Sequence, residues 1–302
     1  MDDARGVTPL RVWAGVGVVW ALLVIGFFAW LHYVDPIHTQ DWVKVHQARI
    51  DACPTEPRWI VILGRSTLMN ATQLPPDMDL GLKEAGLGEY RVLKIGHVGG
   101  VYSDFVDLEP SILALRPALV VAEVGLMLTD RPPVARIYYL KRWLKHHLEQ
   151  NDAIWRPQGE TFLLGVDRYL PCPLDKSRNS TTLKYYVQRH NGHLDDRLAR
   201  SFGGRSSQMA LNFVQSLEER GIPLALTYVP KAEGVFGSRE ELAAQELATL
   251  QARHPTPVWV PDWQPDLEDL CDSMHYTAIG RAWYTRWLVG QVKGRLTAGR
   301  RP

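Results

Sequence analysis

The stretch Trp59-Ile-Val-Ile-Leu-Gly-Arg-Ser66 decides the fold of this chain. Its apolar part, residues 59–63, is rich in β-branched side chains and lies between Pro57 and Gly64, which predicts a short buried strand. The Gly-x-Ser that follows would turn the chain sharply and present the Ser66 hydroxyl at the carboxyl end of this strand. Open α/β sheets bind their ligands at that edge, so Ser66 is a candidate nucleophile.

Further apolar runs repeat this strand pattern along the chain. They are residues 90–95, 118–124, 223–229 and 257–260. Apolar runs of this kind are typical of a parallel sheet that is covered by helices on both faces.

Helical patterns separate these runs. They cover residues 103–115, 206–220, 239–253 and 276–296, and Gly221 follows the second of them, as is usual at the end of a helix. The alternation predicts an α/β fold, a three-layer sandwich around a five-stranded, mainly parallel sheet.

The overall composition is that of an ordinary globular protein. The chain has 302 residues, of which 46% are hydrophobic and 22% are charged, and this size suits one large domain. Because the net charge is only +1, nothing in the charge balance favours a nucleic-acid partner.

Residues 12–34 stand apart from the rest of the chain. Between Arg11 and Asp35 the only ionisable side chain is His32. As a helix this segment would be about 34 Å long, which is enough to cross the hydrocarbon core of a bilayer. The apolar core of a signal peptide is shorter and is followed by a small-x-small cleavage site, which is absent here, so we expect an uncleaved transmembrane helix.

The basic residues around this segment predict its orientation. Arg5 and Arg11 precede it, whereas the first basic side chain after it is Lys44. By the positive-inside rule, the N-terminus would lie in the cytoplasm and the large domain in a bacterial periplasm or at the cell surface, which suits a bacterial inner membrane. The expected organisation is a cytoplasmic tail at 1–11, a transmembrane helix at 12–34, a linker with a short helix at 35–57, and the α/β domain at 58–302.

One part of the α/β domain breaks the alternation of strands and helices. Residues 129–205 are too many for a simple crossover, so we interpret them as an insertion near the functional face, such as a lid. A basic helical pattern with interspersed aromatic residues lies at 136–147. This segment could bind anionic lipid headgroups or a partner. It could equally be a solvated helix whose apolar side packs on the core, and the sequence leaves the two interpretations open.

A second motif, Asp272-Ser-Met-His275, comes just before the last helical pattern. A serine nucleophile, a histidine base and an aspartate that orients the imidazole are the three parts of an acyl-transfer site. Each motif alone has a simpler explanation, because Ser66 or Asp272 could merely cap a helix. Their positions at opposite ends of one α/β domain support the catalytic interpretation.

Four blocks together resemble the SGNH (GDSL-like) hydrolase superfamily. The resemblance covers roughly residues 58–128 and 206–295, and it implies a flavodoxin-like sandwich. The blocks are Trp59-Ile-Val-Ile-Leu-Gly-Arg-Ser-Thr-Leu, Val92-Leu-Lys-Ile-Gly-His-Val-Gly99, Ala118-Leu-Val-Val-Ala-Glu-Val-Gly125 and Cys271-Asp-Ser-Met-His-Tyr-Thr-Ala-Ile-Gly280.

The resemblance also implies roles for individual residues. Ser66 would be the nucleophile, His275 its general base, and Asp272 the residue that holds the imidazole in the right tautomer. The backbone N–H groups of Ser66 and Gly99 would face the oxyanion, with Gly100 as the neighbour that could replace Gly99. No cofactor and no metal ion is implied.

Two positions depart from the family pattern. Arg65 stands where the family has Asp or Ser, and Met127 stands where it has an oxyanion-binding Asn, whose loss typically costs about 10²–10³ in rate. Arg65 either contacts an anionic group of the substrate or pairs with a carboxylate, and both remain open. Glu123, at the end of the third apolar run, is a candidate structural hydrogen-bond partner.

The cysteines and histidines show no spacing typical of a metal site. Cys53, Cys172 and Cys271 lie far apart, and the sequence leaves open whether two of them form a disulfide. The histidines within residues 129–205 have no acidic or cysteine partner at a metal-binding spacing.

The apolar segment and the resemblance together suggest a function. Some envelope-modification systems, such as D-alanylation in Gram-positive envelopes and alginate O-acetylation, pair a polytopic membrane O-acyltransferase with an anchored SGNH-like protein. By analogy we expect a membrane-anchored serine acyltransferase or esterase that transfers or removes O-acyl groups on extracytoplasmic glycans through an acyl-Ser66 intermediate. The expected partners are the polytopic acyltransferase, the glycan or acyl-ester substrate, and the bilayer.

Two other functions fit the same sequence. One is a catalytically inactive SGNH-like subunit that binds a glycan or scaffolds a membrane complex. The other is a free-standing esterase anchored near its substrate.

Overall fold

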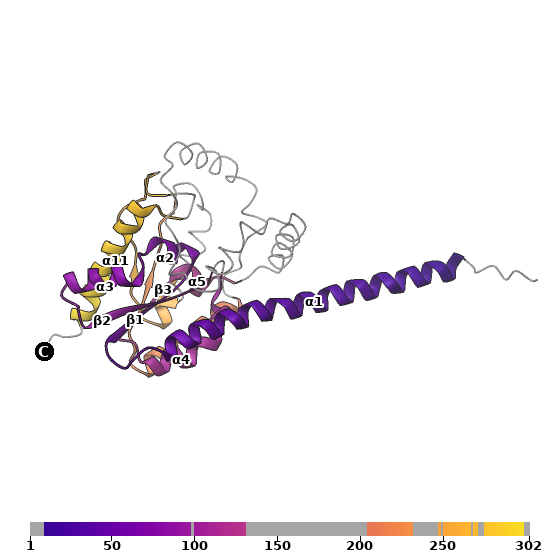
Figure 1. Ribbon diagram of the computed structural model, residues 1–302, viewed down its shortest axis with the longest axis horizontal. Helices are drawn as coiled ribbons and strands as arrows, with labels where there is room; N and C mark the ends of the chain where they lie inside the picture. The colour runs from indigo at the N-terminus through magenta and orange to yellow at the C-terminus, as the bar shows by residue number, and fades with distance from the viewer. Residues whose placement is uncertain are drawn as a thin grey trace, which may run out of the picture.

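The structure is a computed structural model of the chain, and Figure 1 shows an α/β domain with one long helix that projects from it. It describes residues 9–97, 100–130, 204–231, 247–248, 250–266, 268–270 and 275–298, with only the backbone described at 9–11 and 28–41.

The centre of the domain is a parallel sheet whose strand order is β2-β1-β3-β4-β5. All four pairs of neighbouring strands are parallel, and β1 lies between β2 and β3. This confirms the predicted α/β class, the five strands and their direction. The strands are β1 (Arg58–Arg65), β2 (Tyr90–His97), β3 (Leu119–Glu123), β4 (Leu224–Thr227) and β5 (Val258–Trp259).

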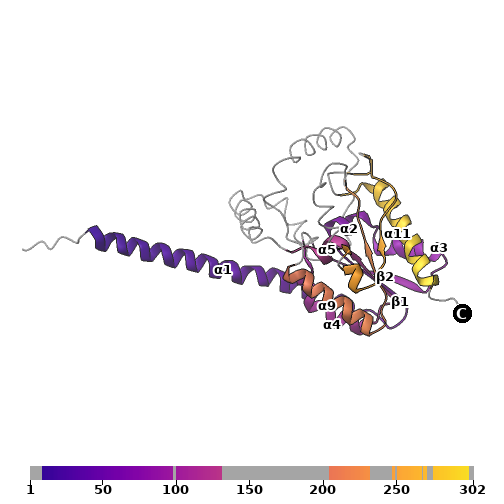
Figure 2. The ribbon, with the colours of Figure 1, turned by 180° about the vertical axis from the view of Figure 1, so that it is seen from behind.

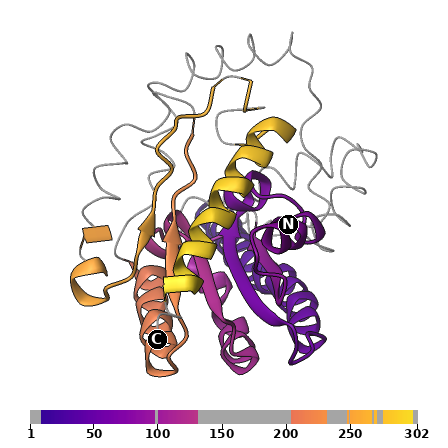
Figure 3. The same cartoon turned by 90° about the vertical axis from the view of Figure 1, so that its left-hand side faces the viewer.

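Helices cover both faces of this sheet, as predicted for three layers (Figure 1, Figure 3). Successive strand side chains point to opposite faces, so Val61 and Leu63 enter one apolar core whereas Ile60 and Ile62 enter the other. The first core is covered by α4 (Glu109–Leu115), α9 (Arg205–Glu219) and the inner end of α1 (Pro9–Asp51). The second core is covered by α2 (Ser66–Ala71), α3 (Pro75–Glu84) and α11 (Ala278–Ala298). Figure 2 shows α4 and α9 side by side.

The N-terminal helix differs from the expected organisation. Helix α1 runs without a break over Pro9–Asp51, so residues 35–51 continue it, where a linker with only a short helix was expected at 35–57. The cause is tertiary packing: Trp42, His46 and Ile50, spaced four residues apart, are buried against the domain. The Trp42 indole N–H also donates to the carbonyl of Gly96 at 2.9 Å.

The outer part of α1 has a different environment. Its described side chains, at residues 12–27, are exposed and include Val12, Trp13 and Trp20. By length and hydropathy, no helix in the described part of the chain qualifies as a membrane span, a result that does not support the span predicted at 12–34.

Two predicted helices differ in detail from their sequence patterns. The helix expected at 103–115 is divided into η1 (Tyr102–Asp104), η2 (Val106–Leu108) and α4, because Pro110 has no N–H to continue a helix and favours the start of a new one. The helix expected from 276 begins at Ala278, because Tyr276 forms an antiparallel bridge with Leu270.

The other helix predictions are tested only where the structure describes them. Helix α9 is confirmed, and Gly221 follows its end with the positive φ of 65° that glycine adopts readily. The helix predicted at 239–253 is described at 247–248 and 250–253, which are helical. Most of the insertion at 129–205, with its basic segment at 136–147, lies outside the described residues.

Candidate active site

Ser66 lies where β1 ends and α2 begins, which confirms the strand–turn–helix predicted from Gly-x-Ser. It is the first residue of α2, its side chain is partly exposed, and Arg65 is the N-cap. Gly64 makes this turn possible, because a Cβ there would lie 2.8 Å from Leu68 Cβ. Since β1 lies between two parallel neighbours, Ser66 follows the carboxyl end of a central strand.

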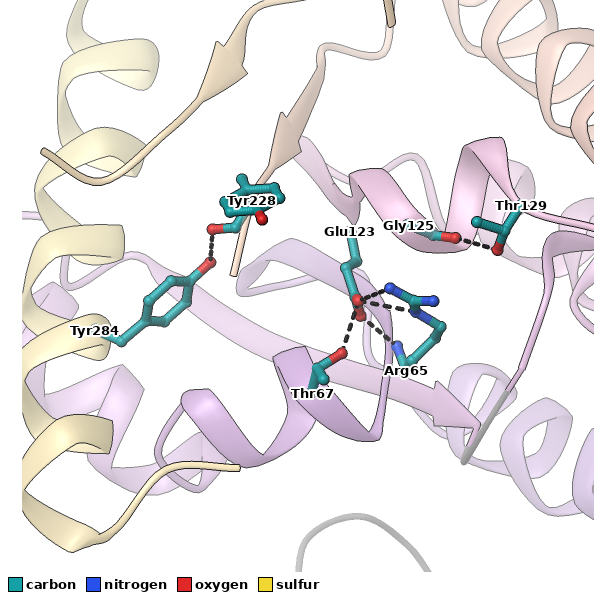
Figure 4. A network of polar contacts seen from close by, with 7 residues as sticks. All are labelled: Arg65, Thr67, Glu123, Gly125, Thr129, Tyr228 and Tyr284. Carbon is teal, nitrogen blue, oxygen red and sulfur yellow. Dashed lines mark hydrogen bonds and ion pairs between the residues drawn. The ribbon is translucent and has the colours of Figure 1, made fainter. Parts of the chain in front are cut away.

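Arg65 and Glu123 join the carboxyl ends of β1 and β3 (Figure 4). The Arg65 guanidinium donates from Nε and Nη2 to Glu123 Oε1, at 2.8 and 2.6 Å. The backbone N–H of Arg65 donates to Oε2 at 2.7 Å, and the Thr67 hydroxyl donates to Oε1 at 2.7 Å. Glu123 therefore accepts four hydrogen bonds from the turn that carries Ser66.

This network keeps Glu123 ionised although it is only 2% exposed. Burial alone would raise the pKa of Glu123, but the Arg65 guanidinium and the hydrogen bonds from Thr67 and Arg65 outweigh it and lower this pKa. Of the two alternatives for Arg65, pairing with a carboxylate is thus observed. Its guanidinium lies directly over Gly125, where a Cβ would be 1.9 Å from Nη2.

A buried lysine holds the other end of α2. Lys94, from the middle of β2, is fully buried, and its Nζ donates to the carbonyls of Met69, Thr72 and Gln73 at 2.9–3.0 Å. A cation at this end satisfies carbonyl groups that the helix leaves without intrahelical partners. Sequence reasoning missed Lys94, although a lysine inside an otherwise apolar strand was a visible signal.

The segment that carries His275 packs against α2. The backbone N–H of Tyr276, the next residue, donates to Asn70 Oδ1 at 2.5 Å, and the Tyr276 hydroxyl donates to the carbonyl of Pro230 at 2.7 Å. The N–H of Thr277 donates to the carbonyl of Asp269 at 2.7 Å. His275 is partly buried, with Nε2 inaccessible to solvent. The structure therefore brings the histidine segment to the helix that begins at Ser66.

The structure describes only some of the remaining predicted site residues. Asp272 and Gly99 lie outside the described residues. Gly100 is described: its N–H donates to the carbonyl of His97 at 3.1 Å, and a Cβ at Gly100 would lie 2.9 Å from His97 Cβ. Met127, in α5 (Val124–Leu128), is fully buried in the core and presents no hydrogen-bond donor.

A polar cluster that sequence reasoning missed lies at the end of β2, around His97. His97 Nδ1 is 3.8 Å from Asp104 Oδ2, and that carboxylate accepts a hydrogen bond from the backbone of Val101 at 3.0 Å. The Trp42 ring contacts both His97 and His46, with centroid distances of 5.0 and 4.7 Å. Helix α1 therefore contacts the strand end that leads into the predicted oxyanion loop.

His46 is held in its neutral form within this cluster. Burial is the main cause, and the charges of Arg49 and His97 add to it, so that the pKa of His46 falls from 6.5 to about 3.

The described residues offer little for metal or disulfide chemistry. No cluster of three or more His, Cys, Asp or Glu side chains among them is placed to hold a metal ion. Cys53 is a free thiol whose Sγ donates to the carbonyl of Arg49 at 3.3 Å. Cys172 and Cys271 belong to parts of the chain that the structure does not describe.

Comparisons with known proteins found similarity only to solved structures. No family profile and no curated protein matches it. Among solved structures, the crystal structure of TesA is similar, with a TM-score of 0.39 and 14% sequence identity over 78% of this chain and 99% of that one. A likeness at this level is too weak to assign a function.

Proposed function

We propose that this protein is a serine-dependent esterase or acyltransferase in which Ser66 is the nucleophile, His275 the general base and Asp272 the residue that orients the imidazole. The observation that carries the proposal is the hydrogen bond from the Tyr276 N–H to Asn70. It holds the residue next to His275 against α2, the helix that Ser66 begins.

The proposed reaction proceeds in two steps. His275 accepts the proton of the Ser66 hydroxyl while Oγ attacks the carbonyl carbon of an ester, and the alcohol leaves with that proton to form acyl-Ser66. A hydroxyl of the acceptor, from a glycan or from water, then loses its proton to His275 and attacks the acyl carbon. The bond between this carbon and Ser66 Oγ breaks, and His275 returns the proton to Oγ, which regenerates Ser66. The backbone N–H groups of Ser66 and Gly99 are the proposed oxyanion donors, and the first N–H of a helix has no intrahelical partner.

Arg65 is the proposed contact for an oxyanion or an anionic substrate group. Glu123 engages its Nε and Nη2, so the ion pair sets the plane of the guanidinium. Figure 4 shows the other terminal nitrogen, Nη1, directed away from Glu123, and it makes no hydrogen bond to the residues described. The Arg65 side chain is 14% exposed, which leaves an edge open to a ligand.

The proposed setting is the outer surface of a bacterial membrane. The apolar segment at 12–34 and the exposed apolar side chains within 12–27 support an anchor, with the N-terminus in the cytoplasm. Acyl transfer to a glycan, together with a polytopic O-acyltransferase, rests on analogy with envelope-modification systems. A topology reporter fused after Pro302 tests the compartment, and reporter activity in the cytoplasm would contradict it.

A non-catalytic subunit is the alternative that specific residues favour. Met127 is buried and has no donor, and the Arg65 guanidinium is held by Glu123. Such a subunit would bind a glycan or scaffold a membrane complex without forming an acyl-serine.

Labelling with a fluorophosphonate, which modifies activated serines, tests the proposal. We expect the wild type to be labelled, Ser66→Ala to remain unlabelled, and His275→Ala to react at least about 10³-fold more slowly. Ser216→Ala, a partly exposed serine on α9 across the sheet, is the matched control and should label normally. Labelling that persists in Ser66→Ala would refute the nucleophile, and an unlabelled wild type would favour the non-catalytic subunit.

A further inference from the structure

We propose that Asn70 is a positioning residue that sets the place of His275 relative to Ser66. This inference rests on the proposed function, because it requires these two residues to react as a pair. Asn70 itself would touch neither the substrate nor the reacting atoms.

The first step in the inference is the geometry of α2. Ser66 is its first residue and Asn70 follows four positions later, so the two residues lie one helical turn apart on the same side. The short helix cannot shift easily, because Lys94 binds the carbonyls at its other end. A contact made by Asn70 is therefore held in a fixed relation to Ser66.

The second step is that Asn70 makes two contacts to the C-terminal segment. It is 1% exposed, and its Oδ1 accepts the Tyr276 N–H at 2.5 Å. Its backbone carbonyl accepts a hydrogen bond from Arg281 Nε in α11 at 2.8 Å. One residue of α2 thus fixes the backbone beside His275 and the first turn of α11.

The third step is that Tyr276 has little freedom to move independently. It is fully buried, pairs with Leu270, and donates its hydroxyl to the carbonyl of Pro230 beyond β4. A Cβ at Gly280 would lie 2.6 Å from its ring and 2.4 Å from the carbonyl of Asp269, so the segment packs closely. The hydroxyl bond holds its ring and the bridge to Leu270 holds its backbone, while Asn70 Oδ1 accepts its N–H and so joins this backbone to α2.

A matched control exists within the same interface. Thr285, in α11, accepts the backbone N–H of Gln73, just after α2, through Oγ1 at 2.8 Å, and it is 3% exposed. Thr285→Val therefore removes the same kind of buried acceptor between the same two regions. Unlike Asn70, Thr285 has no bond to the residue beside His275.

The test compares rates of fluorophosphonate labelling and of p-nitrophenyl acetate turnover in the full-length protein. We expect Asn70→Ala and Thr285→Val to lower the melting temperature by similar amounts. Labelling of Ser66 and kcat should fall by about 10²-fold in Asn70→Ala, with KM little changed, because a small displacement of a base is costly. Both rates should stay within about threefold of wild type in Thr285→Val, since no reacting group moves.

A conservative variant separates positioning from folding. Asn70→Asp keeps an acceptor oxygen at the same position and should recover at least about a tenth of the wild-type labelling rate. If Asn70→Ala fails to fold, Asn70→Ser, whose shorter hydroxyl reaches Tyr276 less well, is expected to react slowly.

Different labelling results would contradict the proposed function and the proposed role of Asn70. A wild type that does not label, or Ser66→Ala that labels fully, would overturn the proposed function and this inference with it. A wild type that labels at Ser66, with an Asn70→Ala variant (or Asn70→Ser, if Asn70→Ala does not fold) that reacts no more slowly than Thr285→Val, would overturn the role of Asn70 alone.

Discussion

At the scale of single residues, the Arg65–Glu123 pair connects the turn at Ser66 with the end of β3. A buried ion pair is weak support for stability, because desolvation offsets the attraction, but removing one partner leaves a costly buried charge. The pair does fix geometry, since Glu123 holds both the backbone and the side chain of Arg65. Its role is therefore better tested by moving Arg65 than by deleting Glu123.

Gly125→Ala moves Arg65 without changing any charge. The new Cβ would lie 1.9 Å from Nη2, so the guanidinium must shift, and we expect a loss of about 1–3 kcal/mol in the free energy of unfolding, measured in urea. Gly81→Ala in α3 is the control, because its Cβ would meet only Val289 Cγ2, at 3.6 Å. That change should be neutral or stabilising by up to about 1 kcal/mol. Equal stability of both variants would contradict the observed position of Arg65.

At the scale of elements, α1 is one helix with two environments. Its outer residues 12–27 are exposed and largely apolar, whereas Trp42, His46 and Ile50 are buried in the domain. Because Trp42 binds the carbonyl of Gly96 and contacts His97, the inner end of α1 supports the strand end that leads to the predicted oxyanion loop. The inner end of α1 is thus part of the α/β domain.

Two tryptophan substitutions separate these environments. Trp42→Ala should lower the free energy of unfolding by about 3–5 kcal/mol, because it removes a buried aromatic ring and its hydrogen bond. Trp13→Ala, at a site that is 71% exposed, should leave this free energy within about 0.5 kcal/mol of wild type. Chemical denaturation of the full-length protein in detergent measures both values, and a mild effect of Trp42→Ala would mean that α1 does not stabilise the domain.

At the scale of the whole molecule, buried ionisable groups set the pH dependence of stability. The folded protein keeps His46 neutral down to a pH of about 3, its folded-state pKa, whereas the unfolded chain protonates it below 6.5. Between these values the unfolded state binds more protons, so stability falls as the pH falls. Glu123, whose pKa is lowered, acts in the same direction at lower pH, since its contribution is lost on protonation.

A neutral replacement of His46 tests this dependence. In the wild type, His46 should contribute a slope of up to about 1.4 kcal/mol per pH unit between pH 6 and 4, with stability greater at the higher pH. His46→Leu should flatten that slope in urea unfolding curves recorded at each pH. Lys44→Leu, two residues away on the exposed side of α1, is the control and should keep the wild-type slope. An unchanged slope in His46→Leu would show that other groups govern acid sensitivity.

The sequence alone was sufficient for features that depend on local pattern. The apolar runs at 59–63 and 118–124 predicted β1 and β3, because a strand covered on both faces needs apolar side chains at every position. Gly-x-Ser likewise predicted the turn at Ser66, since the missing Cβ of Gly64, which would crowd Leu68, and the helix that follows are both local features. The order of strands and helices then restricted the sheet to a parallel one.

Tertiary structure decided the contacts that join distant segments. Asn70 and Tyr276 are 206 positions apart, and Arg65 and Glu123 are 58 apart, so no local pattern could pair them. The continuation of α1 beyond residue 34 also depends on tertiary structure. The local helical pattern there is weak, and burial of Trp42 against the domain stabilises the helix. Sequence patterns report which residues avoid water, whereas only the folded chain determines which polar groups form hydrogen bonds. Here those bonds hold the segment of His275 against the helix that begins at Ser66.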